Sequence, residues 1–151
     1  MTIKKIFILL LLAILTNCDY EPIYKDNNDF NLLIKKIHLV GEKKIDRRIS
    51  NALNLESNNK IKNGHEIEIK SQKKVDIVSK DKTGNASVFK ITINVNVLLK
   101  KEDKMIKEKN FSSSFTYNTK VNKFSLSQYQ KNIEANLIKS IAEEIFIFLN
   151  S

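Results

Sequence analysis

The chain has 151 residues, of which 42% are hydrophobic, and a formal net charge of +9. Its only cysteine is Cys18, which excludes an intramolecular disulfide framework, and its length allows one domain with a real core but not two. The basic balance favours an anionic lipid, an anionic glycan or an acidic protein surface as a partner, or it reflects only a composition rich in Lys, Asn and Ile.

The first 17 residues have the layout of an export signal. Lys4 and Lys5 precede an apolar run from Ile6 to Leu15, which polar residues follow. A bilayer-spanning helix needs roughly 20 apolar residues, so this run is too short to be one. We therefore expect residues 1–17 to be a signal peptide that is removed. An exported protein has no ready access to cellular nucleic acid, so we expect no nucleic-acid partner.

Cys18 stands where a bacterial lipoprotein would carry its lipid. The stretch Leu15-Thr16-Asn17-Cys18 is similar to a lipobox, whose cysteine becomes the acylated first residue. It predicts a covalent lipid, such as palmitate, on Cys18, and we expect no other cofactor. The alternative is an ordinary signal peptide with an unmodified cysteine near its end. Residues 18–29 contain Pro22 and a polar, Asn- and Asp-rich stretch, which predicts a lipidated N-terminus and tether.

Residues 30–151 predict one α+β domain, a two-layer sandwich whose four-stranded, mainly antiparallel sheet is covered by two helices. The period-two alternation from Phe89 to Leu99 is its clearest signal, because it predicts a strand with one buried and one wet face. The element order is β-α-β-β-β-α. The expected strands are 30–40, 65–79, 89–99 and 105–118, and the expected helices are 46–55 and about 23 residues from Ser127 onward.

Four details of this pattern can be tested by structure. Asp46 is a plausible N-cap of the first helix, and Ser127 with Gln130 resembles a capping box at the start of the second. Lys73 falls on the apolar parity of its strand, which predicts an irregularity or an edge there. Glu134 falls on the wet side of the second helix, opposite an apolar stripe that includes Ile141.

No constellation of residues points to catalysis, so we expect a protein that is not an enzyme. His38 and His65 are the only histidines, and each stands alone in or beside a strand, so we expect no metal site. With three glycines, the chain offers no glycine-rich phosphate loop.

Topology nevertheless predicts a basic end of the domain. In a meander, the connection after the second strand and the one after the fourth lie at the same end of the sheet. These connections carry Lys80, Lys82, Lys120 and Lys123, which could bind phosphates through charge-assisted hydrogen bonds. The alternative is a pair of solvated turns, since lysine is common throughout the chain.

The residues after the lipobox resemble a known family. Cys18-Asp19-Tyr20-Glu21-Pro22-Ile23-Tyr24 is similar to the motif Cys-Gly-Phe-x-Pro-Leu-Tyr of the LPS-assembly lipoprotein LptE family, in its shorter alphaproteobacterial form. The similarity continues through the strand order, through Phe111-Ser112-Ser113-Ser114-Phe115-Thr116-Tyr117, and through Ile141-Ala142-Glu143-Glu144-Ile145. It covers nearly the whole chain, although only the first motif is specific.

This resemblance implies an outer-membrane lipoprotein on the periplasmic side. Members of the family help to assemble and plug the LPS-export β-barrel LptD, and they bind LPS, which makes the four lysines the candidate LPS contacts. Asp19 departs from the family's glycine, and in enteric bacteria an aspartate at that position retains lipoproteins in the inner membrane. It therefore favours the alternative of an auxiliary lipoprotein of an ABC-type lipid transport system. A periplasmic hydrolase is a further alternative, for which the sequence offers no site.

Overall fold

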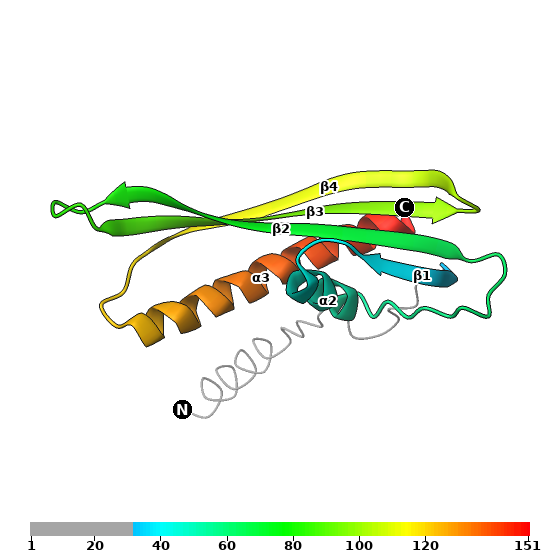
Figure 1. Cartoon of the computed structure of the whole chain (residues 1–151), viewed down its shortest axis with the longest axis horizontal. Coiled ribbons are helices and arrows are strands. Elements are labelled where there is room, and N and C mark those ends of the chain that lie inside the picture. Colours follow the sequence, from blue (N-terminus) through cyan, green and yellow to red (C-terminus); the bar gives the residue numbers. More distant parts are fainter. Residues whose placement is uncertain (1–31) are drawn as a thin grey trace, which may run out of the picture.

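The computed structural model describes residues 32–151 (Figure 1). The signal, Cys18, the tether and the first two residues of the predicted first strand lie outside the described residues. The elements follow the expected order. They are β1 (Ile34–Leu39), α2 (Lys43–Ala52), β2 (His65–Lys80), β3 (Ala86–Lys101), β4 (Lys104–Asn118) and α3 (Lys123–Asn150).

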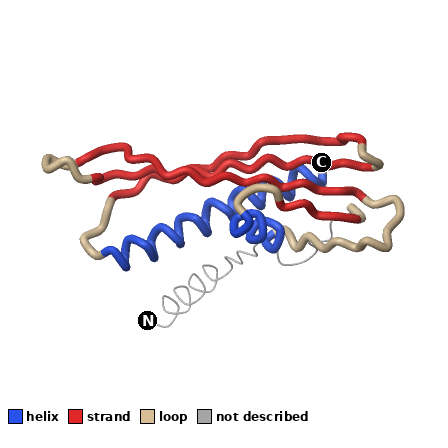
Figure 2. Tube along the Cα trace, in the orientation of Figure 1, coloured by secondary structure: helices blue, strands red, loops and turns tan. Residues whose placement is uncertain are grey.

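The four strands form one sheet in the order β1-β2-β3-β4, with β1 parallel to β2 and the other neighbours antiparallel. Both helices lie on the same side of this sheet (Figure 2). The α+β sandwich with a mainly antiparallel sheet is therefore confirmed. We call the sheet face toward the helices the inner face and the opposite one the outer face.

The core lies between the inner face and the two helices. Every second residue of β3 from Ile91 to Leu99 is at most 3% exposed, because period-two alternation sends these side chains to one face. Ile45 and Ile49 of α2 and Ile141 of α3 meet them from the helix layer. β3 and β4 are joined through Glu102 and Asp103, whose φ angles of 51° and 61° give a tight two-residue hairpin turn.

The N-terminus of α2 differs from the prediction. The helix begins at Lys43, and Asp46 lies inside it, fully buried. Its carboxylate accepts hydrogen bonds from the backbone N–H groups of Gly41, at 2.8 Å, and Ser71, at 2.9 Å. Asp46 is therefore not an N-cap. It fastens the helix to β2 by satisfying two backbone donors that the sheet leaves unpaired.

The start of α3 was also predicted wrongly. Asn122 is the N-cap, and its side-chain oxygen accepts hydrogen bonds from the N–H groups of Phe124 and Ser125. Ser127 lies one turn inside the helix, so its spacing to Gln130 does not form a capping box. With 28 residues, α3 is about 42 Å long and can follow the sheet over most of its length.

Candidate functional site

The two layers of the sandwich separate toward one end. Figure 1 shows α3 inclined to the sheet, close to it at the C-terminal end of the helix and farther from it at the N-terminal end. Apolar side chains of the inner face remain exposed where the helix leaves them: Val75 is 47% exposed, Ile77 54% and Phe115 45%. The β2–β3 turn (residues 81–85) and the β4–α3 link (residues 119–122) bound this region, which we call the open end.

A cleft of about 230 Å³ enters the sandwich between the inner face and the helices. Its walls combine apolar and polar groups from all four long elements and from α2. The lining residues are Lys44, Lys73, Val75, Ile91, Tyr117, Ser127, Gln130, Lys131 and Glu134. Gln130 donates a hydrogen bond of 2.9 Å to the Tyr117 hydroxyl and so ties α3 to β4 across the cleft.

Aromatic rings pack beside this hydrogen bond. The Tyr117 ring stacks on Phe89 with centroids 5.6 Å apart and meets Tyr129 edge-on at 6.1 Å. Lys120 places its ammonium 4.2 Å from the centroid of the Tyr129 ring, within the range of a cation–π contact. The open end therefore sets a basic group directly against apolar surface, as an amphiphilic anion would require.

A partly buried ion network lies along the cleft and bears on two predictions. Glu134 is 8% exposed and accepts from Arg48 of α2 at 2.7 Å and from Lys73 of β2 at 3.0 Å. It is therefore not on the wet side of α3. Lys73 pairs with Ile93 in uninterrupted register, so no irregularity lies there. The predicted edge does lie there, because β1 pairs with β2 only as far as Ile69, and Lys73 finds its charge partner in Glu134 on the helix.

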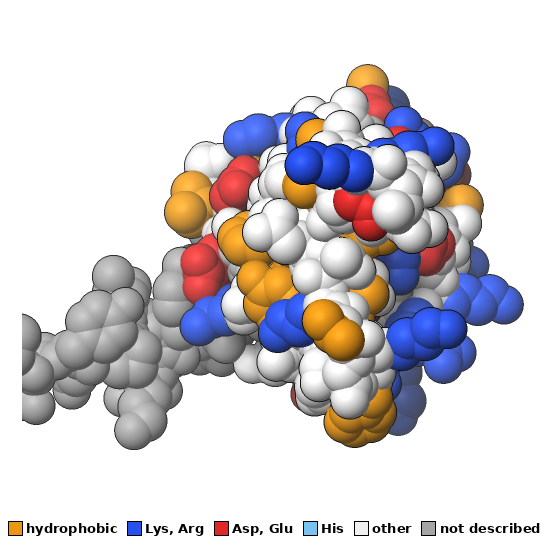
Figure 3. Space-filling view, turned by 90° about the vertical axis from the view of Figure 1, so that its left-hand side faces the viewer, with side chains coloured by type: hydrophobic (Ala, Val, Ile, Leu, Met, Phe, Trp, Pro, Cys, Tyr) orange, Lys and Arg blue, Asp and Glu red, His pale blue; other side chains and the backbone are white. Residues whose placement is uncertain are grey.

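The structure places the four predicted lysines at the open end, but in two groups. Lys80 and Lys82 belong to the β2–β3 hairpin, which projects from the sheet, whereas Lys120 and Lys123 belong to the descent from the sheet to α3 (Figure 1). None of the four lines the cleft. Figure 3 looks onto this end and shows basic and hydrophobic side chains next to one another.

The hairpin that carries Lys80 and Lys82 is held by Asp81. Its carboxylate accepts hydrogen bonds from the Thr83 hydroxyl, at 2.7 Å, and from the Asn85 N–H, at 2.9 Å. These bonds, led by the one from Thr83, lower the pKa of Asp81 below its ordinary value because they favour the charged form. The Asp81 carboxylate is therefore already hydrogen-bonded within the turn.

Sequence reasoning missed three further lysines at this site. Lys44, Lys73 and Lys131 line the cleft from three different elements, so no spacing along the chain brings them together. The one available signal was Lys73 on an apolar parity, because a lysine at such a position needs an acidic partner from the other layer. Lys100, Lys101 and Lys104 lie at the opposite end, around the β3–β4 turn, where Lys100 is 3.5 Å from Glu68.

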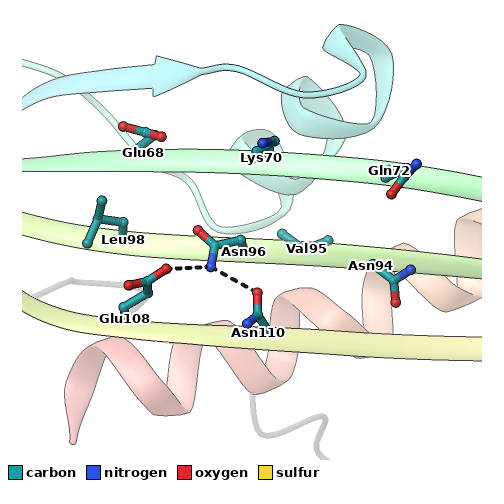
Figure 4. Close-up of a pocket in the computed structure, with 9 residues that line it drawn as sticks. All are labelled: Glu68, Lys70, Gln72, Asn94, Val95, Asn96, Leu98, Glu108 and Asn110. Carbon is teal, nitrogen blue, oxygen red and sulfur yellow. Dashed lines mark hydrogen bonds between the residues drawn. The ribbon is translucent and has the colours of Figure 1, made fainter.

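The outer face carries a wider hollow of about 470 Å³, shown in Figure 4. It is lined largely by polar side chains, and its amides bond to one another. Asn96 donates to both Glu108 and Asn110 at 2.9 Å. Its lining comes from β2, β3 and β4 alone, so no helix closes it as α2 and α3 close the cleft.

The two histidines have different surroundings. His38 lies 3.4 Å from Glu66, and His65 has a buried Nδ1 without a hydrogen-bond partner. Within residues 32–151, no group of three His, Cys, Asp or Glu side chains could hold a metal ion. In that same part of the chain, no helix is both long and apolar enough to cross a membrane.

Several solved structures share this fold. No protein-family model matches the chain, and no curated protein matches it by sequence. The rare lipoprotein B of Shewanella oneidensis superposes with a TM-score of 0.57 at 12% identity, covering 76% of this chain and 93% of its own. The minor lipoprotein of Acinetobacter baumannii gives 0.56 at 13% identity, over 79% and 94%. The "uncharacterized lipoprotein B" of Nitrosomonas europaea gives 0.52 at 12% identity, over 76% and 81%. The chain therefore has the fold of these lipoproteins.

Proposed function

We propose that this chain is an outer-membrane lipoprotein of the periplasmic side, attached through a lipid on Cys18. In this role it helps to assemble and plug the LPS-export β-barrel LptD, and it binds LPS during delivery to the cell surface. The role is not enzymatic. The shared lipoprotein fold, the lipobox-like stretch before Cys18 and the motif around Pro22 support this proposal.

The observation that carries the LPS part is the open end. LPS presents phosphates beside acyl chains, so its site must offer cations next to apolar surface. At the open end Lys120 lies on the Tyr129 ring, and Val75, Ile77 and Phe115 expose apolar surface on the inner face. Lysine ammonium groups bind phosphate oxygens through charge-assisted hydrogen bonds, whose strength falls with salt when the groups are exposed.

Two matched variants test the site. Replacing Lys80, Lys82, Lys120 and Lys123 with Gln should weaken LPS binding and flatten its dependence on salt. The melting temperature should change little, because exposed charges contribute little to stability. Replacing Lys100, Lys101 and Lys104 with Gln at the opposite end should have a much smaller effect. Equal weakening by both sets would mean that the net charge acts as a diffuse field and that the open end holds no site.

The anchor has its own test. A single acyl chain binds membranes marginally, whereas the several chains of a mature lipoprotein hold firmly. Cells expressing the protein should incorporate radioactive palmitate into it, and Cys18→Ala should abolish this labelling. If the wild-type protein never incorporates palmitate, the lipid anchor is wrong, and the alternative of an ordinary signal peptide with an unmodified cysteine remains.

Asp19 supports a second candidate, an auxiliary lipoprotein of an ABC-type lipid transport system. An aspartate after the lipidated cysteine is the inner-membrane retention signal of enteric bacteria, whereas the motif around Pro22 favours LPS assembly. A pull-down from solubilised envelopes separates the two. A large outer-membrane barrel should co-purify if the first proposal is correct, and an inner-membrane ATPase complex if the second is.

A further inference from the structure

Strand β2 has 16 residues and is much longer than β1, its neighbour on one side, which has 6. β1 pairs only with the stretch from His65 to Ile69, and the residues after it extend this contact a little, because the N–H groups of Val40 and Glu42 donate to the carbonyls of Ile69 and Ser71. β2 then continues to Lys80. Within residues 32–151, no strand pairs with this edge of β2 beyond that point, and we call the stretch from Val75 to Lys80 the open edge.

The backbone groups that face this edge can be identified from its covered part. The N–H of His65 and the C=O of Ile69 form hydrogen bonds toward the β1 side. The backbone N–H and C=O groups of the odd-numbered residues of β2 therefore face that side. The register with β3 is uninterrupted through Ile77. The next groups in the same row are therefore the N–H and C=O of Val75 and Ile77.

Acidic side chains occupy the last two donors before the open edge. Asp46 accepts from the Ser71 N–H at 2.9 Å, and Glu42 accepts from the Lys73 N–H at 2.6 Å. Each carboxylate oxygen takes the place that a carbonyl of a neighbouring strand would have. Beyond Lys73 this substitution ends, and a row of backbone donors and acceptors faces outward, which is the arrangement that an added strand completes.

The side chains of the open edge also suit an added strand. Val75 and Ile77 point to the inner face and remain about half exposed, and Val75 lines the cleft. A strand laid beside β2 would turn every second side chain toward the same cleft. Backbone hydrogen bonds would hold the segment, and the cleft would select apolar side chains at alternate positions.

We propose that the open edge binds an extended acidic segment of a partner protein as a fifth strand of the sheet. The basic side chains around the edge favour an acidic occupant. Lys44, Lys74, Lys80 and Lys131 surround the edge and the cleft, and Lys73 lies at its start. Two acids offset part of this charge, because Asp76 pairs with Lys74 at 2.9 Å and Glu134 with Lys73 at 3.0 Å, and the balance around the edge stays basic.

Antiparallel self-pairing of a second copy centred on Ile77 sets Lys74 opposite Lys80 on both sides of the centre, and like charges in facing positions destabilise a sheet. A register centred on Val75 would set Lys74 opposite Asp76, but it carries the second strand past Lys73, where Glu42 and Asp46 already occupy the edge donors.

The other edge of the sheet, β4, is protected in a way that the open edge is not. Lys107 and Lys109 of β4 turn inward, where their ammonium groups lie 5.7 and 5.9 Å from the centroid of the Phe148 ring. Inward-pointing lysines hinder the approach of another strand. β4 therefore supplies a matched control for substitutions at the open edge.

The test uses the protein purified from membranes in detergent and a fluorescent peptide of about nine residues that alternates Glu and Val, long enough to span the open edge. Fluorescence anisotropy should show binding, and the Lys/Val counterpart should bind about tenfold more weakly. Val75→Pro removes an edge-facing N–H without touching the pairing with β3, so it should weaken binding about tenfold. Ser114→Pro, the same change on an edge-facing position of β4, should leave binding unaltered.

A second variant covers the case in which Val75→Pro does not fold. Val75→Asp keeps the backbone donor but sets a like charge against the acidic peptide, and it too should weaken binding about tenfold, with an unchanged circular dichroism spectrum. Equal binding by wild type and both Val75 variants would overturn the proposal. So would a protein dimer in sedimentation that Val75→Asp abolishes, or binding to anionic vesicles that depends on Val75 in the absence of peptide binding.

Discussion

Glu134 joins three elements through one carboxylate. It accepts from Arg48 of α2 and Lys73 of β2 while its own backbone belongs to α3. Its side chain is 11% exposed, whereas those of its partners are 36% and 34% exposed. The carboxylate is thus largely desolvated, and the two cations keep part of their contact with water.

Removing this carboxylate should destabilise the fold. Breaking a fully buried ion pair costs roughly 3–5 kcal/mol, and the exposure of both cations reduces this for Glu134→Ala to about 1–3 kcal/mol. Urea denaturation measures the change. Glu144→Ala, at an exposed position on the same helix, should stay within about 0.5 kcal/mol. If the two variants unfold at the same urea concentration, the network contributes nothing to stability.

Gly41 is the second residue that the packing of the helix layer against β2 requires. A Cβ at this position would overlap the backbone nitrogen and oxygen of Ser71, so only glycine lets the chain run this close to β2. Gly41→Ala should cost at least about 1–3 kcal/mol, because the clash is with backbone and the strand must move. Gly84→Asn, at a hairpin position with φ of 85° and nothing within 4 Å, should change the melting temperature little. An unchanged melting temperature for Gly41→Ala would contradict the close approach.

For single residues, the sequence predicts which apolar side chains face the core better than it predicts the hydrogen-bond partners of charged side chains. The alternation from Phe89 to Leu99 was sufficient to identify the inner face, because period two is a property of the strand itself. Asp46 and Glu134 were misassigned for a common reason. Each belongs to a helix, and each carboxylate is satisfied by donors on β2 that are distant in sequence.

The element that decides the shape of the cleft is α3. Its buried positions lie from Ile133 to Leu149, whereas Phe124 near its start is 78% exposed. The helix is therefore fully packed on the sheet only in its C-terminal two-thirds, whereas Leu126 and Tyr129 near its start are partly buried against the core. The start of α3 was placed too late because Ser127 and Gln130 have capping-box spacing, and Asn122 gave no comparable pattern before the structure showed its two backbone contacts.

Ile141 tests the packed part of this element. It is fully buried, so Ile141→Ala should destabilise the protein by about 2–5 kcal/mol, and Ile141→Asp should prevent folding because it buries an unpaired charge. Ile147→Ala, which truncates a side chain that is 63% exposed on the same helix, is the control and should have little effect. A melting temperature unchanged by Ile141→Asp would mean that this face of α3 packs on something other than the sheet.

At the scale of the whole molecule the two ends of the sheet differ in structure. β1 begins opposite His65, so the chain enters the domain at the end that also holds the β3–β4 turn. The open end lies at the other extreme of strands that run for 16 residues, a span of about 50 Å. The topology that groups Lys80, Lys82, Lys120 and Lys123 was predictable from the meander. The separation of the layers was not, because it depends on the angle of α3.

This asymmetry predicts a gradient of stability along the molecule. The end near β1 contains most of the core, whereas the open end has exposed apolar side chains on the inner face and a helix start that packs little. Hydrogen exchange should therefore be slowest for the amides around Ile67 and Val97 and faster in residues 75–90, 113–118 and 123–132, because regions with few buried contacts open at lower free energy.

Adding LPS should then slow exchange selectively at the open end. A ligand that binds only the folded form stabilises the region that it contacts, and the end of the domain near β1 already exchanges through rarer openings. The Lys80, Lys82, Lys120 and Lys123→Gln variant should lose this protection while keeping the gradient of the free protein. Uniform exchange along the free chain would contradict the gradient. Protection by LPS centred on the β3–β4 turn would place the ligand at the wrong end of the molecule.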